Sequence, residues 1–296
     1  MFPPQFEYVQ PDSIDQAIAA LASDDTRVLA GGHSLLPAMK ARNASPESLV
    51  DIGDISALHR IDRDGPENET VIGAAVTDAD ILADGSLKRN APMVHEAIAA
   101  VGDRQIRSRG TVVGNLLQAD AGADIPAAMV AADAMLTIRN GEGERTVPVD
   151  ELYEDPDNDH HPAAITNGDD LATEVRIPDV TGGAYLRKTH PATGYALVGI
   201  AVRLVTDGGT IAKARVVATG IERTPRRLPG VEERLIDKAP SSLPDQTVRI
   251  ADPEPAAVRA DPNVSGPYRH QLLESYTGQA IAVASDRVAP GGGENE

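Results

Sequence analysis

Two glycine-containing turns hold the residue types in this chain that are best suited to bind a phosphate-rich ligand. The first reads Ala30-Gly31-Gly32-His33-Ser34-Leu35. Adjacent glycines allow positive φ angles and a close approach of the backbone to a ligand, and successive N–H groups with the Ser34 hydroxyl can form an anion nest. The turn therefore predicts a pyrophosphate site, with a plain turn after a strand as the alternative. It matches neither the G-x-G-x-x-G fingerprint nor a P-loop.

The second turn reads Arg109-Gly110-Thr111-Val112-Val113-Gly114-Asn115-Leu116 and lies about 80 residues further along the chain. The Asn115 amide and the Thr111 hydroxyl can donate hydrogen bonds, and Gly114 leaves room for a bulky anion. Asp124 follows nine residues after Asn115, where its carboxylate could accept hydrogen bonds from a ribose hydroxyl. The same carboxylate could instead cap a helix. The two roles are compatible.

Secondary-structure signals place each turn after a strand or before a helix. Ser13 and Gln16 form a capping-box pattern ahead of apolar residues at helical spacing. In the first half of the chain we expect strands at residues 27–30, 49–52, 71–76 and 135–138, and helices at 14–21, 77–82, 92–101 and 123–132. A short helix is also expected between the first turn and the second strand. Residues 154–168, rich in Asp, Asn, His and Pro, predict a surface loop.

Beyond residue 170 the pattern changes to longer strands. They are expected at residues 171–177, 184–189, 196–206 and 211–220. The last two are joined by Asp207-Gly208-Gly209, a strong hairpin signal. Helices are expected near residues 231–237, 254–260 and 267–283. An α/β half, about 1–175, thus precedes an α+β half, about 180–286.

The composition excludes several classes of site and partner. The 296 residues include no cysteine, so the chain can hold no disulfide, no thiolate zinc site, no cysteine-ligated iron–sulfur cluster and no cysteine nucleophile. The net charge of −18 disfavours nucleic acid as a partner. Five of the 27 basic residues are lysines, a pattern typical of proteins from a salt-accumulating cytoplasm. The 41% hydrophobic residues are enough to build a core.

Taken in order and spacing, these motifs resemble the FAD-binding medium subunit of the molybdenum hydroxylases, the family of aerobic carbon monoxide dehydrogenase and xanthine dehydrogenase. The resemblance rests on the two glycine turns and on Ala119-Asp120 with Asp124-Ile125-Pro126. It extends over nearly the whole chain, through Leu49-Val50-Asp51-Ile52, Tyr185-Leu186-Arg187-Lys188, Tyr195-Ala196-Leu197-Val198-Gly199-Ile200-Ala201 and Tyr268-Arg269-His270-Gln271-Leu272-Leu273.

The resemblance implies an α+β protein with two domains. An N-terminal FAD-binding α/β domain of the PCMH-like type would span residues 1–178, in subdomains of about 1–56 and 57–178. A C-terminal α+β domain with a small antiparallel sheet and helices would span 179–286. Residues 287–296 would form a flexible tail.

The resemblance also implies roles for single residues. Ala30, Gly31, Gly32, His33, Ser34 and Leu35 would wrap the FAD pyrophosphate in one loop, and Gly110, Thr111, Gly114 and Asn115 in the second. Asp124 would reach the adenosine ribose, Tyr195 would approach the isoalloxazine, and Lys188 would lie near the flavin. The FAD would be non-covalent, with His33 acting as a loop residue rather than as an attachment point. No catalytic acid, base or nucleophile is required of this chain.

Val113 departs from the family pattern, which usually reads Thr-Ile-Gly-Gly-Asn in the second turn. Val113 stands where the first of those glycines is expected. A β-branched side chain disfavours positive φ and needs space. Either the position tolerates it, or the loop sits slightly differently.

As a member of such a complex, the chain would work with two partner subunits. A large subunit would carry molybdopterin and a small one two [2Fe–2S] clusters, and this chain would pass electrons from FAD to NAD⁺, a quinone or oxygen. The substrate, whether carbon monoxide, a purine, an aldehyde or an N-heterocycle, would be set by the large subunit. We expect a cytoplasmic protein with no membrane span.

Two other functions remain open from the sequence: a free-standing FAD-dependent oxidoreductase, and a flavin-free nucleotide-binding or assembly protein, which Val113 favours. Two further features have simpler interpretations. His160-His161 beside acidic residues predicts a solvated loop rather than a metal site. Arg104, Arg107 and Arg109 form the densest basic cluster, which could face a partner, the FAD phosphates or surface carboxylates.

Overall fold

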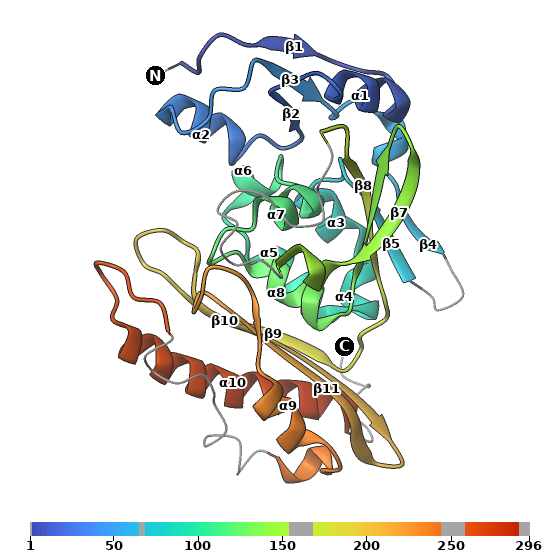
Figure 1. Cartoon of the computed structure of the whole chain (residues 1–296). Helices are drawn as coiled ribbons and strands as arrows, with labels where there is room; N and C mark the ends of the chain where they lie inside the picture. The colour runs from blue at the N-terminus through green and yellow to red at the C-terminus, as the bar shows by residue number, and fades with distance from the viewer. Residues whose placement is uncertain (1, 65–68, 154–167, 244–257, 290–296) are drawn as a thin grey trace. The chain divides into compact units, whose positions relative to one another are not determined.

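A computed structural model of the chain describes residues 2–64, 69–153, 168–243 and 258–289 (Figure 1). The chain forms two compact units, and each unit collects three separate stretches of sequence. Unit 1 comprises Met1–Asp84, Gly102–Gln118 and Ala134–Ile177. Unit 2 comprises Gly85–Val101, Ala119–Asp133 and Pro178–Glu296. The domain limits expected at about residues 56, 178 and 286 stay predictions. The two compact units alternate with each other along the sequence.

Unit 1 begins with a small parallel sheet in the order β1-β3-β2. Its elements are β1 (Glu7–Val9), α1 (Ile14–Leu21), β2 (Thr26–Leu29), α2 (Leu35–Ala41) and β3 (Ser48–Asp51). The Ser13 hydroxyl caps α1 by accepting a hydrogen bond from the Gln16 N–H at 3.3 Å, as the sequence predicts. Leu29, Met39 and Leu49 form the buried core of this part. The first glycine turn is the link between β2 and α2.

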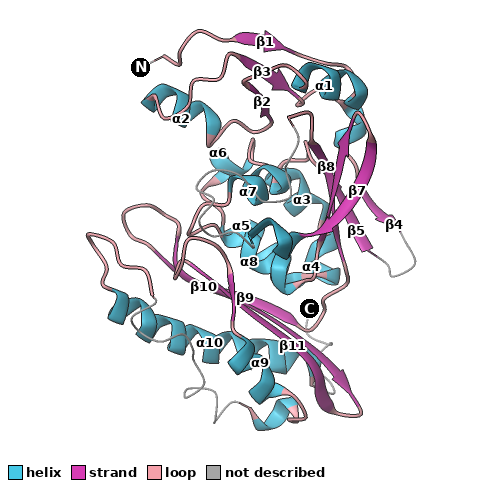
Figure 2. Ribbon diagram, in the orientation of Figure 1, coloured by secondary structure: helices cyan, strands magenta, loops and turns pink. Residues whose placement is uncertain are grey.

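A five-stranded antiparallel sheet, ordered β4-β5-β8-β6-β7, forms the rest of unit 1 (Figure 2). Its strands are β4 (Ile61–Asp64), β5 (Glu69–Gly73), β6 (Met135–Asn140), β7 (Gly143–Pro148) and β8 (Leu171–Ile177). Around it lie η1 (Ser56–Leu58), α3 (Asp78–Asp84), α6 (Arg104–Arg107), α7 (Val112–Gln118) and η2 (Val149–Tyr153). Helix α7 packs against β8, so this sheet supports the second glycine turn.

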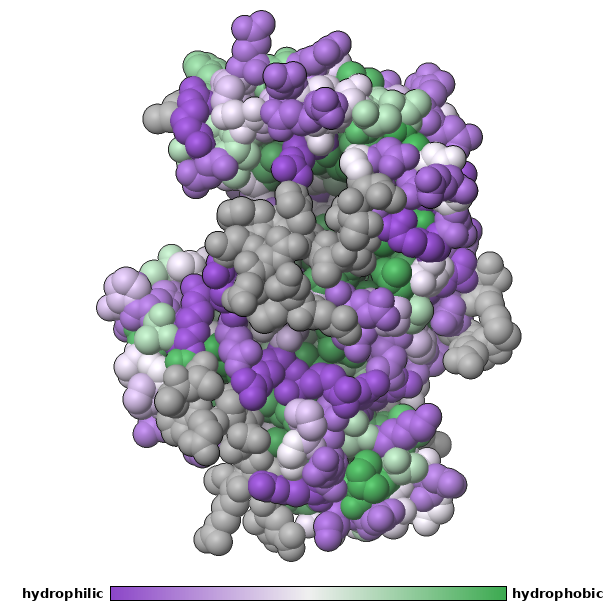
Figure 3. Space-filling model, viewed as in Figure 1, coloured by the Kyte–Doolittle hydropathy of each residue, from purple (hydrophilic) through white to green (hydrophobic). Residues whose placement is uncertain are grey.

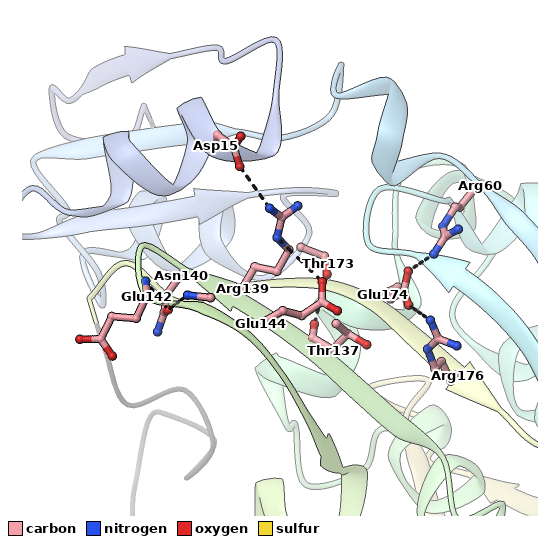
Figure 4. Close-up of polar contacts among 11 residues, drawn as sticks. Asp15, Arg60, Thr137, Arg139, Asn140, Glu142, Glu144, Thr173, Glu174 and Arg176 are labelled. Atoms are coloured by element: carbon pink, nitrogen blue, oxygen red, sulfur yellow. Dashed lines mark hydrogen bonds and ion pairs between the residues drawn. The ribbon is translucent and has the colours of Figure 1, made fainter. Parts of the chain in front are cut away.

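Ion pairs join helix α1 to the larger sheet of unit 1 and lie along the strands of that sheet (Figure 4). Arg139 of β6 donates to Asp15 of α1 at 3.2 Å. Glu174 of β8 lies between Arg60 and Arg176, with 2.8 Å to the Arg176 guanidinium. Because the pair of Asp15 and Arg139 spans 124 positions of sequence, it ties the first helix to the larger sheet.

Unit 2 is built on an antiparallel sheet in the order β12-β11-β10-β9. Its elements are α4 (Ser86–Asn90), α5 (Pro92–Ala100), α8 (Asp124–Ala131), β9 (Gly183–Thr189), β10 (Ala196–Asp207), β11 (Thr210–Thr219), β12 (Arg226–Arg227), α9 (Pro229–Leu235), η3 (Pro240–Ser242) and α10 (Gly266–Val288). The predicted hairpin between β10 and β11 is confirmed: Gly208 and Gly209 have φ of +57° and +87°, the region that a two-residue hairpin turn needs.

Alternation along β10 separates two layers of unit 2. Val198, Ile200, Val202 and Leu204 join the apolar cluster that includes residues of α10. On the intervening positions, Arg203 donates to the Ala132 carbonyl at the end of α8. Successive side chains of a strand point to opposite faces, so α10 and α8 cover opposite faces of this sheet.

Most expected elements are present, with shifted ends. Helix α10 runs to Val288, past the expected end at residue 283, and the strand expected at 71–76 is β5 (Glu69–Gly73). Four strands and three short helices were not anticipated: β1, β4, β7, β12, α4, α6 and α7. Residues 154–167 of the loop expected at 154–168, with His160 and His161, and the tail from 290 onward lie outside the described residues. So does most of the helix expected at 254–260.

Hydrophilic residues cover much of the surface seen in Figure 3, with smaller apolar areas between them. Within the described ranges, no helix combines the length and the apolar character that crossing a membrane requires.

Two valines on β10 test how far the unit 2 core contributes to stability. Val202 is fully buried and Val205 is 37% exposed. Val202→Ala removes two buried methyl groups and leaves a cavity, so we expect the free energy of unfolding to fall by about 2–3 kcal/mol. The measurement is a denaturant titration in high salt. Val205→Ala is the matched control and should cost less than about 1 kcal/mol; equal losses would contradict this assignment of the core.

Candidate functional site

The two glycine turns meet directly in unit 1. A Cβ atom on Gly31 would lie 2.1 Å from the Arg109 carbonyl oxygen and 3.1 Å from the Cα of Gly110. Gly32 adopts φ of +75°, a left-handed conformation that glycine adopts without strain. Ser34 precedes α2, and its hydroxyl makes no capping hydrogen bond, so it is available to a ligand. Motifs about 80 residues apart in sequence therefore form one backbone-lined surface.

The second turn leads straight into helix α7. The Thr111 hydroxyl accepts a hydrogen bond from the Gly114 N–H at 3.2 Å, and Gly114 is exposed. The Asn115 Oδ1 atom is buried and has no hydrogen-bond partner among the described residues. A buried polar oxygen without a partner costs free energy, so Asn115 marks a place where a donor from a ligand would be stabilising.

Val113 fits the second turn without strain. It is the second residue of α7 and is buried, and it is not among the described residues with positive φ. The position that the family pattern gives to glycine is helical in this chain, where a β-branched residue is allowed. The loop therefore tolerates Val113, the first of the two possibilities raised by the sequence.

A buried carboxyl group, Asp78, supports the second turn from behind. Its N–H donates to the Gly110 carbonyl at 2.8 Å, and a Cβ on Gly110 would lie 2.8 Å from its Oδ2 atom. Its Oδ1 atom has no hydrogen-bond partner among the described residues. Burial raises the pKa of Asp78 to about 7, against the opposing positive charge of Arg107. Sequence analysis did not single out Asp78, because an aspartate at a helix start is normally exposed.

Asp124 lies in unit 2, at the first position of α8 and 3% exposed. The Tyr185 hydroxyl donates to its Oδ1 atom at 2.6 Å, and the Arg187 guanidinium donates to its Oδ2 atom at 2.8 Å. Burial raises the pKa of Asp124, and the charge of Arg187 opposes that rise. Asp124 is the first residue of α8 and not its N-cap, which is Ala123. Its contacts with β9 are the interaction that sequence reasoning missed.

Tyr195 is also in unit 2 and is 46% exposed. Its hydroxyl donates to Asp120 Oδ2 at 2.9 Å, and burial together with the Asp120 charge raises its pKa to about 12. A Cβ on Gly122 would lie 3.1 Å from the Tyr195 Cβ. Tyr195 and the loop of residues 119–123, called the 119–123 loop below, therefore form one surface with a neutral, partly exposed aromatic ring. Lys188 is exposed on β9.

The other predicted residues of unit 1 lie in the first glycine turn and around α6. His33 is exposed in the first turn. Asp103 caps α6 by accepting hydrogen bonds from two backbone N–H groups. Arg104, the first residue of that helix, and Arg109, two residues past its end, are exposed. Unit 1 thus gathers both glycine turns and the basic cluster, which suits a phosphate-rich ligand. Unit 2 gathers Asp120, Asp124, Tyr195 and Lys188.

Two family models account for almost the whole chain. The model described as FAD binding domain in molybdopterin dehydrogenase matches residues 4–180. The model described as CO dehydrogenase flavoprotein C-terminal domain matches residues 185–284.

Characterised relatives are similar over most of their length. The carbon monoxide dehydrogenase medium chain of Hydrogenophaga pseudoflava is 34% identical over 81% of this chain and 83% of the relative. Subunit alpha of the 6-hydroxypseudooxynicotine dehydrogenase complex of Paenarthrobacter nicotinovorans is 32% identical over 98% of both chains. A chain of the reconstituted CO dehydrogenase from Oligotropha carboxidovorans has a TM-score of 0.86 at 33% identity, over 97% of this chain and 100% of that one.

Asp78 makes stability depend on pH in a defined direction. Its pKa is about 7 in the folded chain against an ordinary value of 3.8, so the folded state binds the proton more tightly and stability falls as pH rises between these values. Asp78→Asn removes the buried charge. We expect a gain in unfolding free energy on the order of 2–4 kcal/mol at pH 8 that vanishes toward pH 4.

The control for this experiment is Asp80→Asn on the same helix. Asp80 is exposed, so its replacement removes one negative charge, as Asp78→Asn does, without removing a buried charge. Thermal or denaturant unfolding across the pH range should show the gain in the Asp78 variant alone. A gain of equal size in both variants would assign it to relief of overall charge repulsion.

Proposed function

This chain belongs to the FAD-binding medium subunits of the molybdenum hydroxylase family, and from that premise we propose that it carries electrons through FAD within a larger dehydrogenase complex. The observation that carries the proposal is the contact of Gly31 with Arg109 and Gly110. It brings the two backbone turns together so closely that no additional side chain fits between them.

The residues of unit 1 would bind the dinucleotide. Backbone N–H groups of residues 31–34 and the Ser34 hydroxyl would donate to the pyrophosphate, and Thr111 and Gly114 would border it in the second turn. The unpartnered Asn115 Oδ1 is an acceptor that a ligand donor would satisfy. Each of these groups fits FAD by its chemistry and its place in the turns.

The residues of unit 2 would meet the other parts of the cofactor. Both Asp124 oxygens already accept hydrogen bonds from Tyr185 and Arg187, yet a carboxylate oxygen can accept more than one. A ribose hydroxyl would therefore share an acceptor whose position is already fixed. Tyr195 offers an exposed ring for the isoalloxazine, with Lys188 on the neighbouring strand. The isoalloxazine supplies the redox chemistry once bound, and the protein supplies its binding, orientation and electrostatics.

Partner subunits would supply the electrons. A chain without cysteine cannot hold the usual iron–sulfur clusters, which we assign to a small subunit, with molybdopterin on a large one. Two relatives are named for carbon monoxide and for 6-hydroxypseudooxynicotine, which supports a substrate chosen by the large subunit. The cytoplasmic location expected from the sequence stays a prediction.

The alternatives are less well supported. A flavin-free assembly protein was favoured by Val113, and the helical setting of that residue removes the reason. A free-standing oxidoreductase would need a proton donor over the flavin, and the described residues offer no clear candidate. The test is to co-express the chain with its iron–sulfur and molybdopterin partners in multimolar salt. Flavin absorbance that acid releases and substrate bleaches supports the proposal; a colourless complex contradicts it.

Gly31→Ala tests the contact between the two glycine turns. Its Cβ would clash with the Arg109 carbonyl, so the turns must separate and we expect FAD affinity to fall at least about tenfold. Flavin content after purification and FAD titration of the complex are the measurements. Gly168→Ala is the matched control in unit 1, because its Cβ would have no neighbour within 4 Å. Equal flavin content in the two variants would contradict a role for this contact in FAD binding.

A further inference from the structure

Arg269 is a buried arginine in the first turns of helix α10, 3% exposed. A buried charge is tolerated only when it is paired and hydrogen-bonded. The Arg269 Nη1 atom donates to the carbonyl oxygens of Leu197 at 2.7 Å and Gly220 at 2.5 Å, and its Nη2 atom pairs with Asp261. A planar guanidinium can serve such divergent acceptors at once, whereas an ammonium group cannot hold the same fixed geometry.

The two carbonyls held by Arg269 belong to the strand ends that flank the 119–123 loop. Gly220, just after β11, donates its N–H to the Ala121 carbonyl at 3.0 Å. Ala196, which precedes Leu197, donates to the Gly122 carbonyl at 3.0 Å. The 119–123 loop is therefore paired with the same two strand ends that Arg269 pulls together, and Tyr195 stands at one of them.

Gly220 shows how close this approach is. Its φ is +83°, and a Cβ would lie 2.6 Å from the Leu197 carbonyl oxygen and 2.8 Å from that of Ala196. The backbones of the β10 start and the β11 end thus touch at a point where no side chain fits. The Arg269 guanidinium, on α10, donates to one backbone carbonyl of each of these two strand ends.

Asp261 connects Arg269 to the other side of Tyr195. Its Oδ2 atom lies 3.7 Å from the His190 Nε2 atom. The His190 Nδ1 atom accepts from the Ala192 N–H at 3.1 Å, which assigns the ring proton to Nε2, facing Asp261. The His190 N–H donates to the Tyr195 carbonyl at 2.8 Å. Residues 190–195 therefore form a turn closed by the His190 N–H, and the His190 ring lies next to the Asp261 carboxylate, which pairs with the same arginine.

We propose that Arg269 is a positioning residue that holds Tyr195 and the 119–123 loop in the arrangement that receives the flavin. It acts through the Leu197 and Gly220 carbonyls, to which it donates, and its ion-pair partner Asp261 lies next to the 190–195 turn on the other side of Tyr195. The inference rests on the proposed function for its link to flavin. Its structural part concerns unit 2 alone.

A matched control lies on the same helix. Arg287, near the other end of α10, pairs with Glu96 of α5 and donates to the Gly183 carbonyl. It makes the same kinds of contact as Arg269, with a carboxylate and a backbone carbonyl, yet neither Glu96 nor Gly183 belongs to the 119–123 loop or the 190–195 turn. Arg269→Lys and Arg287→Lys should both lower thermal stability, so stability alone does not separate positioning from support.

The first readout needs no flavin. The chain contains no tryptophan, so Tyr195→Trp introduces a single fluorescent reporter at the position in question. Acrylamide quenching of that reporter should rise about twofold when Arg269→Lys is added and stay unchanged when Arg287→Lys is added, since only the first releases the turn. Equal quenching in both double variants, measured below the unfolding transition, would overturn the proposal.

The second readout uses FAD titration of the co-expressed complex with Tyr195 intact. Arg269→Lys should weaken FAD binding roughly tenfold, and Arg287→Lys by less than about twofold. A wild-type complex that binds no FAD would contradict the proposed function, while the quenching comparison would still judge the positioning of Tyr195. A wild-type complex that binds FAD, with equal losses in both variants, would reduce Arg269 to a supporting role.

Discussion

The contact between Gly31 and the Arg109 carbonyl is the constraint on which unit 1 depends. Two peptide backbones approach there so closely that even a methyl group has no space. Such an approach requires β2 and α2 to hold one turn and α6 and α7 the other. The Asp78 N–H and the Thr77–Thr111 bridge then fix the second turn from behind. Both sheets of unit 1 serve as the frame for this single contact.

Unit 2 depends on buried charge as well as on the close backbone approach at Gly220. Asp124, which contacts Tyr185 and Arg187, and Arg269, which pairs with Asp261, are buried ionisable groups, and their charged partners are partly exposed. Each charge is offset by a partner and by backbone carbonyls, which is the condition for burying it at tolerable cost. Every cation in these clusters is an arginine. A planar guanidinium can donate to several acceptors at once, so a chain with few lysines can still form such clusters.

Sequence analysis succeeded where local patterns carry the information. The Ser13 cap, strand β8 and the Gly208-Gly209 hairpin follow from capping, apolar content and turn chemistry. Strands β1, β4 and β7 were missed because they are short or polar, and β7 is largely exposed. The burial of Asp78 and the engagement of Asp124 with β9 depend on contacts distant in sequence, which no local pattern encodes. Val113 looked unfavourable only because its helical backbone conformation could not be foreseen.

The interleaving of the units has a consequence for biosynthesis. Helices α5 and α8 emerge from the ribosome early, but the sheet they cover is made from residues after 178. Helices α5 and α8 also contact each other, but until those strands appear the faces that pack on the sheet are uncovered, and an incomplete chain exposes them to other chains. A gene cut at the boundary between the two family domains would encode a first half in which these two helices lack their sheet. The chain therefore completes its folding as one piece, late in synthesis.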